Sequence, residues 1–367
     1  MDKLKLLKIA TPLFVLLTLA ACSMGQEEDR TVIQDPGESI NDTEDKITET
    51  NVPSISIEKV DKFEGMEITD WFDEQTVVLA KENEEFGKMS LLENSEYYPR
   101  SIYLYNLDTK EYKTVKAQKD MFLGGATLSP DKKHLLYYEY SFGDVAHYLM
   151  SMDNMGQPVA EDNLGIAYTA EWADNQHVIG ASYAGGAYMA DTDRNITQIA
   201  ELEEEQLFTV QKIQDKIYYI TTNTPTFQLH MLDLVTKEKR DLNVENVDGI
   251  TFSPDGKQIL ISQGTESTRR LLLADAEGNI LKTIAEGSEI TGDSWSPNQQ
   301  RIAYQLKSVI NGEDSSGLYV YDVLTGESTQ LAADVRNAHI IWSPSGDKIA
   351  VTELDGLTYN SSVIYLR

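Results

Sequence analysis

Carboxylates are the side chains of this sequence that could carry acid–base chemistry. Four of them lie beside short apolar runs that we expect to be strands, namely Glu67, Asp70, Glu171 and Asp293. Two carboxyl groups held about 5–10 Å apart can protonate a leaving group and activate a nucleophile at a glycosidic bond. Because no local motif brings these four residues together, a hydrolase or lyase that acts on cell-envelope glycans is the alternative hypothesis.

The other residues that could do chemistry form no recognisable catalytic or metal-binding motif. The five histidines include no HExxH pair, and the sequence has no phosphate-binding loop or cofactor fingerprint. Aspartates that end apolar runs are explained by Asx turns, in which the carboxylate binds nearby backbone N–H groups; they are Asp153, Asp191, Asp233, Asp275 and Asp322. We therefore predict a protein that is not an enzyme and that has no metal and no cofactor.

The only cysteine, Cys22, ends an apolar stretch close to the N-terminus. Three lysines precede the stretch, and residues 9–21 are too few for an ordinary membrane span. The string Leu19-Ala20-Ala21-Cys22 resembles the lipobox of bacterial lipoproteins. This resemblance implies a signal peptide over residues 1–21 and acylation, such as palmitoylation, of Cys22. Each acyl methylene buried in the bilayer contributes about 0.8 kcal/mol, so several chains give stable anchoring.

Residues 22–53 are rich in acidic side chains and lack aromatic ones. Such a segment cannot bury enough apolar surface to fold, so we predict a disordered tether. The formal net charge of the whole chain is −29, which argues against a nucleic-acid partner. Together with the lipobox, these features predict an extracytoplasmic lipoprotein on the outer face of the cell membrane, in a bacterium of the Gram-positive type.

A turn motif recurs along the rest of the chain. In its clearest copy, Phe252 is followed by Ser253-Pro254-Asp255-Gly256 and then by an apolar run. Proline, aspartate and glycine each favour a position of a tight turn, and the run that follows is typical of a strand. Further copies are anchored by Leu128, Trp295 and Trp342, and looser ones by Trp71, Trp172 and Ile213. A repeat of about 40 residues is typical of four-stranded propeller blades.

The two hairpin signals in each repeat predict an all-β domain over residues 54–367. We expect a seven-bladed β-propeller, with six blades as the second choice. The last repeat lacks a fourth strand, whereas residues 54–60 form an alternating strand with no repeat of its own. We therefore expect residues 54–60 to pair with residues 361–367 and complete the last blade, which leaves no unpaired gap in the ring.

The apolar-Ser-Pro-Asp-Gly-Lys pattern around Phe252 resembles the TolB-type, WD40-like propeller repeats of bacterial envelope proteins. The resemblance covers residues 54–367 and implies the propeller fold, with a role in binding. TolB itself has an N-terminal α/β domain, which an acidic tether replaces here. The chain is therefore more similar to TolB-like lipoproteins of Gram-positive bacteria.

Segments expected to join the second and third strands of the repeats are rich in tyrosine, serine, glycine and asparagine, a composition that suits recognition. Tyrosine and arginine are also enriched in binding hot spots. We predict a membrane-anchored binding or scaffold module, monomeric, whose partner is a protein, a peptide or a glycan. The predicted binding residues are Tyr97, Tyr98, Arg100, Tyr140, Phe142, Tyr183, Phe227, Arg269 and Tyr359, with His339 as a contact in the central channel.

Overall fold

Apolar runs between polar turns form the strands of this protein, shown by a computed structural model. The structure describes residues 55–90, 96–141, 144–153, 169–182, 184–193, 195–222, 226–265, 267–310, 313–356 and 358–367. These residues hold 27 strands and two 3₁₀ helices, Glu84–Phe86 and Ala200–Leu202. Within these ranges no helix is long and apolar enough to span a bilayer. The predicted signal peptide, the tether and Cys22 lie outside them.

Four sheets are each built from four consecutive antiparallel strands, as the paired hairpin signals predict. The first holds β9 (Ala170–Trp172), β10 (His177–Ala181), β11 (Ala187–Asp191) and β12 (Ile196–Gln198). The second holds β13 (Leu207–Ile213), β14 (Lys216–Thr221), β15 (Gln228–Asp233) and β16 (Lys239–Glu245). The third holds β17 (Val247–Phe252), β18 (Gln258–Gly264), β19 (Arg269–Asp275) and β20 (Ile280–Gly287). The fourth holds β21 (Glu289–Trp295), β22 (Arg301–Ile310), β23 (Glu313–Asp322) and β24 (Ser328–Ala333).

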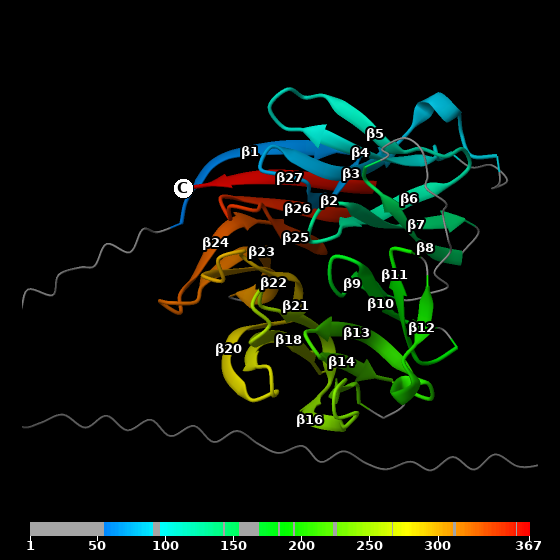
Figure 1. Ribbon diagram of the computed structural model, residues 1–367. Coiled ribbons are helices and arrows are strands. Elements are labelled where there is room, and N and C mark those ends of the chain that lie inside the picture. The colour runs from blue at the N-terminus through cyan, green and yellow to red at the C-terminus, as the bar shows by residue number, and fades with distance from the viewer. Residues whose placement is uncertain are drawn as a thin grey trace, which may run out of the picture. The chain divides into compact units, whose positions relative to one another are not determined.

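A fifth four-stranded sheet joins the two ends of the propeller. It contains β25 (Ala338–Trp342), β26 (Lys348–Asp355), β27 (Thr358–Leu366) and β1 (Ile57–Glu64). β1 runs antiparallel to β27, with Ile57 opposite Leu366 and Glu64 opposite Asn360. In Figure 1 the blue strand β1 lies beside the red strand β27. The predicted pairing of the N-terminal strand with the last segment is confirmed.

The remaining strands form one seven-stranded sheet instead of separate blades. Its members are β2 (Met66–Trp71), β3 (Thr76–Glu82), β4 (Arg100–Asn106), β5 (Tyr112–Lys116), β6 (Phe122–Leu128), β7 (His134–Ser141) and β8 (Asp144–Ser151). The prediction of seven four-stranded blades, with six as the second choice, is therefore wrong. The described residues form five four-stranded blades and this larger sheet.

One parallel bridge is the physical reason for the difference. Arg100, at the start of β4, pairs with Phe122, at the start of β6. The backbone N–H of Arg100 also donates to the carbonyl of Met121 over 3.0 Å. The spacing of the repeats predicts hairpins, which form between neighbouring segments of the chain. This bridge joins two different repeats, so it depends on how closely they approach in space.

The apolar residues that precede the turns connect neighbouring sheets. Three tryptophan indoles donate to backbone carbonyls of the preceding repeat. The pairs are Trp172 with Thr127 at 3.1 Å, Trp295 with Thr251 at 3.4 Å, and Trp342 with Ser294 at 3.1 Å. The ring of Phe252 lies 4.6 Å from that of Tyr218 in the sheet before it. The repeated packing position inferred from the sequence is thus an inter-sheet contact.

The serine of each turn motif accepts a hydrogen bond from the backbone N–H of the first residue of the strand that follows. The hydroxyl of Ser253 accepts the backbone N–H of Gln258 at 3.0 Å and donates to Asp255 at 2.8 Å. The same bond to the residue five positions later is made by Ser129, Ser296 and Ser343. All four serines are buried. The motif therefore recurs because it closes a hairpin without leaving a buried polar group unpaired.

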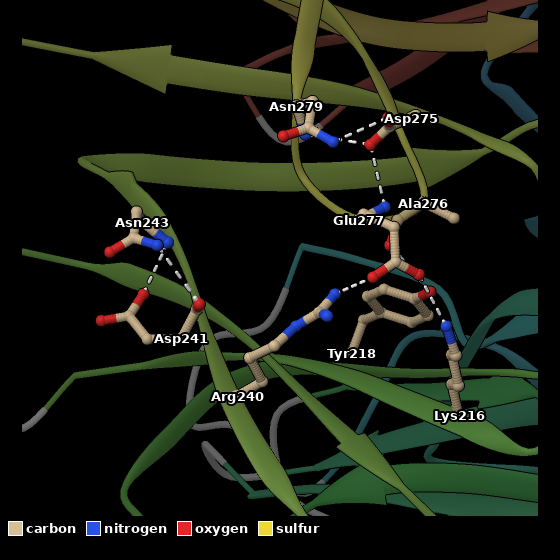
Figure 2. A network of polar contacts seen from close by, with 9 residues as sticks. All are labelled: Lys216, Tyr218, Arg240, Asp241, Asn243, Asp275, Ala276, Glu277 and Asn279. Atoms are coloured by element: carbon tan, nitrogen blue, oxygen red, sulfur yellow. Dashed lines mark hydrogen bonds and ion pairs between the residues drawn. The ribbon is translucent and has the colours of Figure 1, made fainter.

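A polar network fastens the second consecutive sheet to the third (Figure 2). Glu277, in the turn after β19, accepts from Lys216 at 2.8 Å and also pairs with Arg240. The hydroxyl of Tyr218 donates to the carbonyl of Ala276 over 3.0 Å. These contacts join β14 and β16 to the following repeat and supplement the apolar packing between the sheets.

Candidate functional site

One rim of the propeller gathers the starts of the first and third strands and the ends of the second strands, because consecutive strands are antiparallel. We call it the loop rim. Most of the binding residues predicted from the sequence belong to it. Phe142, Tyr183 and Cys22 lie outside the described residues.

Arg100 is the centre of a buried polar group on this rim. Its Nη2 donates to Glu67 Oε2 at 2.8 Å and to the carbonyl of Ala80 at 3.1 Å. Its guanidinium lies 4.4 Å from the ring centre of Tyr359. The side chains of Arg100 and Glu67 are only 12% and 10% exposed. β4, β2 and β27, which are distant in sequence, thus contribute to one contact.

Burial shifts the pKa values of two acidic groups in this contact, the Glu67 carboxyl and the Tyr138 hydroxyl. Burial raises the pKa of Glu67, and the nearby Arg100 charge opposes this shift. Burial also raises the pKa of Tyr138, with a further contribution from Glu67. Gly124 leaves room for both groups, since a Cβ at this position would lie 2.6 Å from the Tyr138 hydroxyl. We call Glu67, Arg100, Tyr138 and Tyr359 the arginine cluster.

Three rings form an exposed aromatic surface on the same rim. Phe122 lies 6.5 Å from Tyr97 in an edge-on arrangement and 6.2 Å from Tyr140. Tyr97 and Tyr140 are 42% and 39% exposed. Because Phe122 is the bridge partner of Arg100, this surface adjoins the arginine cluster. We call Tyr97, Phe122 and Tyr140 the aromatic patch.

A second aromatic pair lies at the rim of another sheet. Phe227, directly before β15, stacks on Phe208 of β13 with ring centres 5.4 Å apart. Their exposed fractions are 37% and 41%. Phe208 and Phe122 were not among the predicted residues, although each lies at the start of the first strand of its repeat. That position, directly after the link between repeats, was the signal that could have identified them.

Arg269 lines a separate cavity at the loop rim. Its Nε lies 2.9 Å from Asp248 Oδ2, and the cavity has a volume of about 470 Å³. The wall also includes Ser262 of β18 and the start of β21. This cavity therefore lies between the third and fourth of the consecutive sheets.

Two further predicted residues do not join these groups in a described contact. Tyr98 is half-buried next to Tyr97. His339 lies on β25, the first strand of the closing sheet, where solvent reaches it. Desolvation by the surrounding protein lowers its pKa. The structure thus brings Tyr97, Arg100, Tyr140 and Tyr359 to one region of the rim.

The four candidate catalytic carboxylates have different partners. Glu67 binds Arg100, and Asp70 accepts the backbone N–H of Leu128 at 2.7 Å. Asp293 accepts from Ser262 at 3.3 Å. Burial raises the pKa of Glu171 to about 7, while a hydrogen bond from Gln211 opposes the shift. The carboxyl group of Glu171 therefore titrates well above the usual range of a glutamate.

The same carboxylates form no metal site within the part of the chain that the structure describes. Among the described ranges, no three histidine, cysteine, aspartate or glutamate side chains lie together as a metal site requires. Four aspartates at strand ends instead accept backbone N–H groups of their own turns: Asp191, Asp233, Asp275 and Asp322. These Asx turns were expected, whereas Asp153 directly precedes residues outside the described part.

Comparison with known proteins supports the fold. No family model matches the chain, and no curated protein matches its sequence. An oligogalacturonate lyase from Vibrio parahaemolyticus aligns with a TM-score of 0.60 at 11% identity, over 85% of this chain and 98% of that one. The chain has the β-propeller fold. The predicted propeller is confirmed, and at this identity the likeness concerns the fold alone.

Two other solved structures resemble the propeller. An oligogalacturonate lyase in complex with manganese gives a TM-score of 0.59 at 12% identity, over 84% of this chain and 96% of that one. TolB from Acinetobacter baumannii gives a TM-score of 0.46 at 14% identity, over 80% of this chain and 65% of that one. The described residues of the propeller hold no cluster that would fit a manganese ion.

Proposed function

We propose that this chain is a non-enzymatic binding or scaffold propeller, held at the outer face of a bacterial membrane through acylated Cys22. Its loop rim binds a protein, a peptide or a glycan. The observation that supports this proposal is the aromatic patch beside the arginine cluster. Exposed tyrosines next to a guanidinium are typical of binding hot spots.

The patch combines exposure with rigidity, which favours binding. Phe122 and Tyr140 are paired across β6 and β7, and Tyr97 packs on Phe122. Aromatic side chains held in this way lose little conformational entropy when a ligand covers them. Below the patch, the guanidinium of Arg100 is oriented by Glu67 and Tyr359, so a partner meets a surface that is already formed.

Binding is tested with the full chain in detergent, against isolated cell-wall glycan fragments and against envelope proteins captured by photo-crosslinkers placed at the rim. Tyr97→Ser and Tyr140→Ser are expected to weaken the contact that the wild type makes. Leu324→Ser is the control, because Leu324 is exposed but lies in the turn between β23 and β24, at the opposite end of the strands. Equal binding by all three variants would refute the proposed surface.

The anchor is tested separately by metabolic labelling with an alkyne-bearing palmitate. The wild type should incorporate the label and sediment with membranes. Cys22→Ser should lose both properties. Labelling that persists in Cys22→Ser would refute the anchor but leave the binding proposal intact.

A second candidate function is cleavage of acidic envelope glycans, favoured by the raised pKa of Glu171. A carboxylate with a pKa of about 7 suits general acid–base catalysis at neutral pH. Turnover of a polyuronide with the appearance of an unsaturated product, abolished in Glu171→Gln, would support the enzyme and contradict the first proposal. Absence of turnover in the wild type would eliminate this second candidate.

A further inference from the structure

We propose that the cavity between β17 and β21 binds a primary alkylammonium group, carried by a lysine side chain or by a free amine. This inference rests on the proposed function, because it names the ligand chemistry for one part of the loop rim. Neither the aromatic patch nor the arginine cluster contributes to the cavity wall. The site can therefore be tested independently of them.

The cavity is large enough for a small organic group. Its volume of about 470 Å³ lies within the range of roughly 300–1,000 Å³ that is usual for ligand pockets. Its polar side chains come from β17, β18, β19 and β21 and the residues flanking them, namely Asp248, Ser262, Arg269, Ser288, Glu289, Thr291 and Asp293. Convergence of several strands gives the wall a defined geometry.

Two glycines, Gly264 and Gly292, permit close approaches in and behind this wall. Gly264 has no side chain to displace the ion pair, since a Cβ there would lie 2.3 Å from Arg269 Nη1 and 2.5 Å from Asp248 Oδ2. Gly292 has a φ of +65° and lies so close to β25 that a Cβ would be 2.3 Å from the carbonyl of Ala338. The two glycines allow Asp248 and Asp293 to line one cavity.

The hydroxyl groups of the wall already donate their hydrogens to the protein. Ser262 donates to Asp293 at 3.3 Å, Thr291 to the amide oxygen of Gln305 at 2.6 Å, and Ser288 to the carbonyl of Lys307 at 3.2 Å. Each hydroxyl oxygen therefore presents acceptor lone pairs. A ligand that complements these groups must donate hydrogen bonds.

The charged side chains of the wall favour a cationic donor over a neutral one. Asp248 is paired with Arg269, whose guanidinium also donates to the carbonyl of Thr265. Asp293, in contrast, is held by the hydroxyls of Thr251 and Ser262. Glu289 adds another carboxylate to the lining. The lining therefore holds three carboxyl groups and one guanidinium, so it offers more partners for a cation than its own Arg269 uses.

Burial raises the pKa of Asp293, because no cation offsets the loss of hydration of its carboxylate. A bound ammonium would supply that counter-charge and stabilise the ionised form of Asp293. An ammonium has three donors on a compact cation, so it can bond Asp293 and the hydroxyl oxygens at once. A neutral sugar would satisfy the acceptors but not the charge.

Isothermal titration of the full chain in detergent tests the proposal. The probes are Nα-acetyl-lysine N-methylamide and cadaverine, and the neutral comparators are Nα-acetyl-norleucine N-methylamide and galactose. We expect at least one amine to bind about ten-fold or more tightly than its neutral comparator, and less tightly as salt increases. Preference for the lysine derivative indicates a peptide ligand, and equal binding of cadaverine indicates free amines. Equal binding of the norleucine derivative, binding of galactose alone, or failure of both amines would overturn the proposal.

Two variants connect binding to the cavity. Asp293→Asn should weaken amine binding about ten-fold or more, because it keeps the shape but removes the charge. Asp334→Asn is the matched control: Asp334 is exposed at the end of β24 on the same rim, outside the wall. Unchanged affinity in Asp293→Asn, with both variants folded by circular dichroism, would overturn the proposal.

The outcome is separable from that of the proposed function. If amines fail to bind while Tyr97→Ser still weakens partner binding, only the ammonium site is refuted. If amines bind but the aromatic variants have no effect, the aromatic surface is refuted and the cavity remains.

Discussion

Ser56 and Arg367 exchange two backbone hydrogen bonds, 3.1 Å and 3.0 Å long. They extend the pairing of β1 with β27 by one step and bring together residues from the two ends of the described propeller. This pairing covers the edge of β27, which would otherwise expose unpaired backbone groups. Closure also orients Tyr359, at the start of β27, against Arg100.

The first prediction concerns this closure. Phe63→Ala in β1 should lower the free energy of unfolding by about 3–5 kcal/mol, because Phe63 is buried and its ring contacts that of Tyr105. Urea unfolding followed by tryptophan fluorescence measures the change. Val60→Ala is the control, since Val60 lies on the same strand but is 42% exposed. Equal losses in both variants would contradict a specific role for the buried side of β1.

The second prediction concerns the arginine cluster. Arg100→Met should cost about 3–5 kcal/mol of unfolding free energy, because it leaves the Glu67 carboxylate buried without its cation. The double variant Arg100→Met, Glu67→Gln should recover most of this loss. Arg270→Met is the control and should cost about 0–1 kcal/mol, since Arg270 and Glu286 form an exposed pair. Additive effects of the two cluster substitutions would show that the residues are not coupled.

The third prediction concerns the repeated turn. Ser253→Ala should destabilise the propeller by about 1–3 kcal/mol, because the partly buried N–H of Gln258 loses its acceptor. Chemical denaturation is again the measurement, and Ser267→Ala in the exposed β18–β19 loop is the control. A Ser253→Ala variant as stable as the control would mean that water replaces the hydroxyl.

The fourth prediction is a pH dependence caused by Glu171. Its carboxyl group keeps its proton up to about pH 7 in the folded protein but loses it near 4.5 in the unfolded chain. Its contribution to stability is therefore complete below pH 4.5 and declines by about 3 kcal/mol as pH rises through 7. Glu171→Gln should remove this decline.

Urea midpoints at pH 5 and pH 8 measure the effect. The wild type should lose more stability between these values than Glu171→Gln does. Glu238→Gln, in the exposed turn after β15, serves as the control and should follow the wild type. If Glu171→Gln also follows the wild type, the carboxylate is not the group that titrates.

Local patterns in the sequence were sufficient for the strands, the turns and the closing pair. Ser253-Pro254-Asp255-Gly256 carries its own turn chemistry, so each copy predicts a hairpin that the structure contains. The alternating strand before the first repeat and the incomplete last repeat likewise indicated their pairing. The hairpins were predictable because their turn hydrogen bonds join residues only a few positions apart. The closing pair was predictable because a strand without a repeat and a repeat without its fourth strand complete each other.

Only the tertiary structure decided the number of separate sheets and the composition of the site. The bridge between Arg100 and Phe122 unites two runs of strands, and the contact of Arg100 with Tyr359 joins residues from the beginning and the end of the propeller. No spacing in the sequence encodes either contact, because each depends on how closely two sheets approach. The sequence by itself determined an all-β repeat with aromatic loops, and packing between the sheets selected which of those aromatics meet.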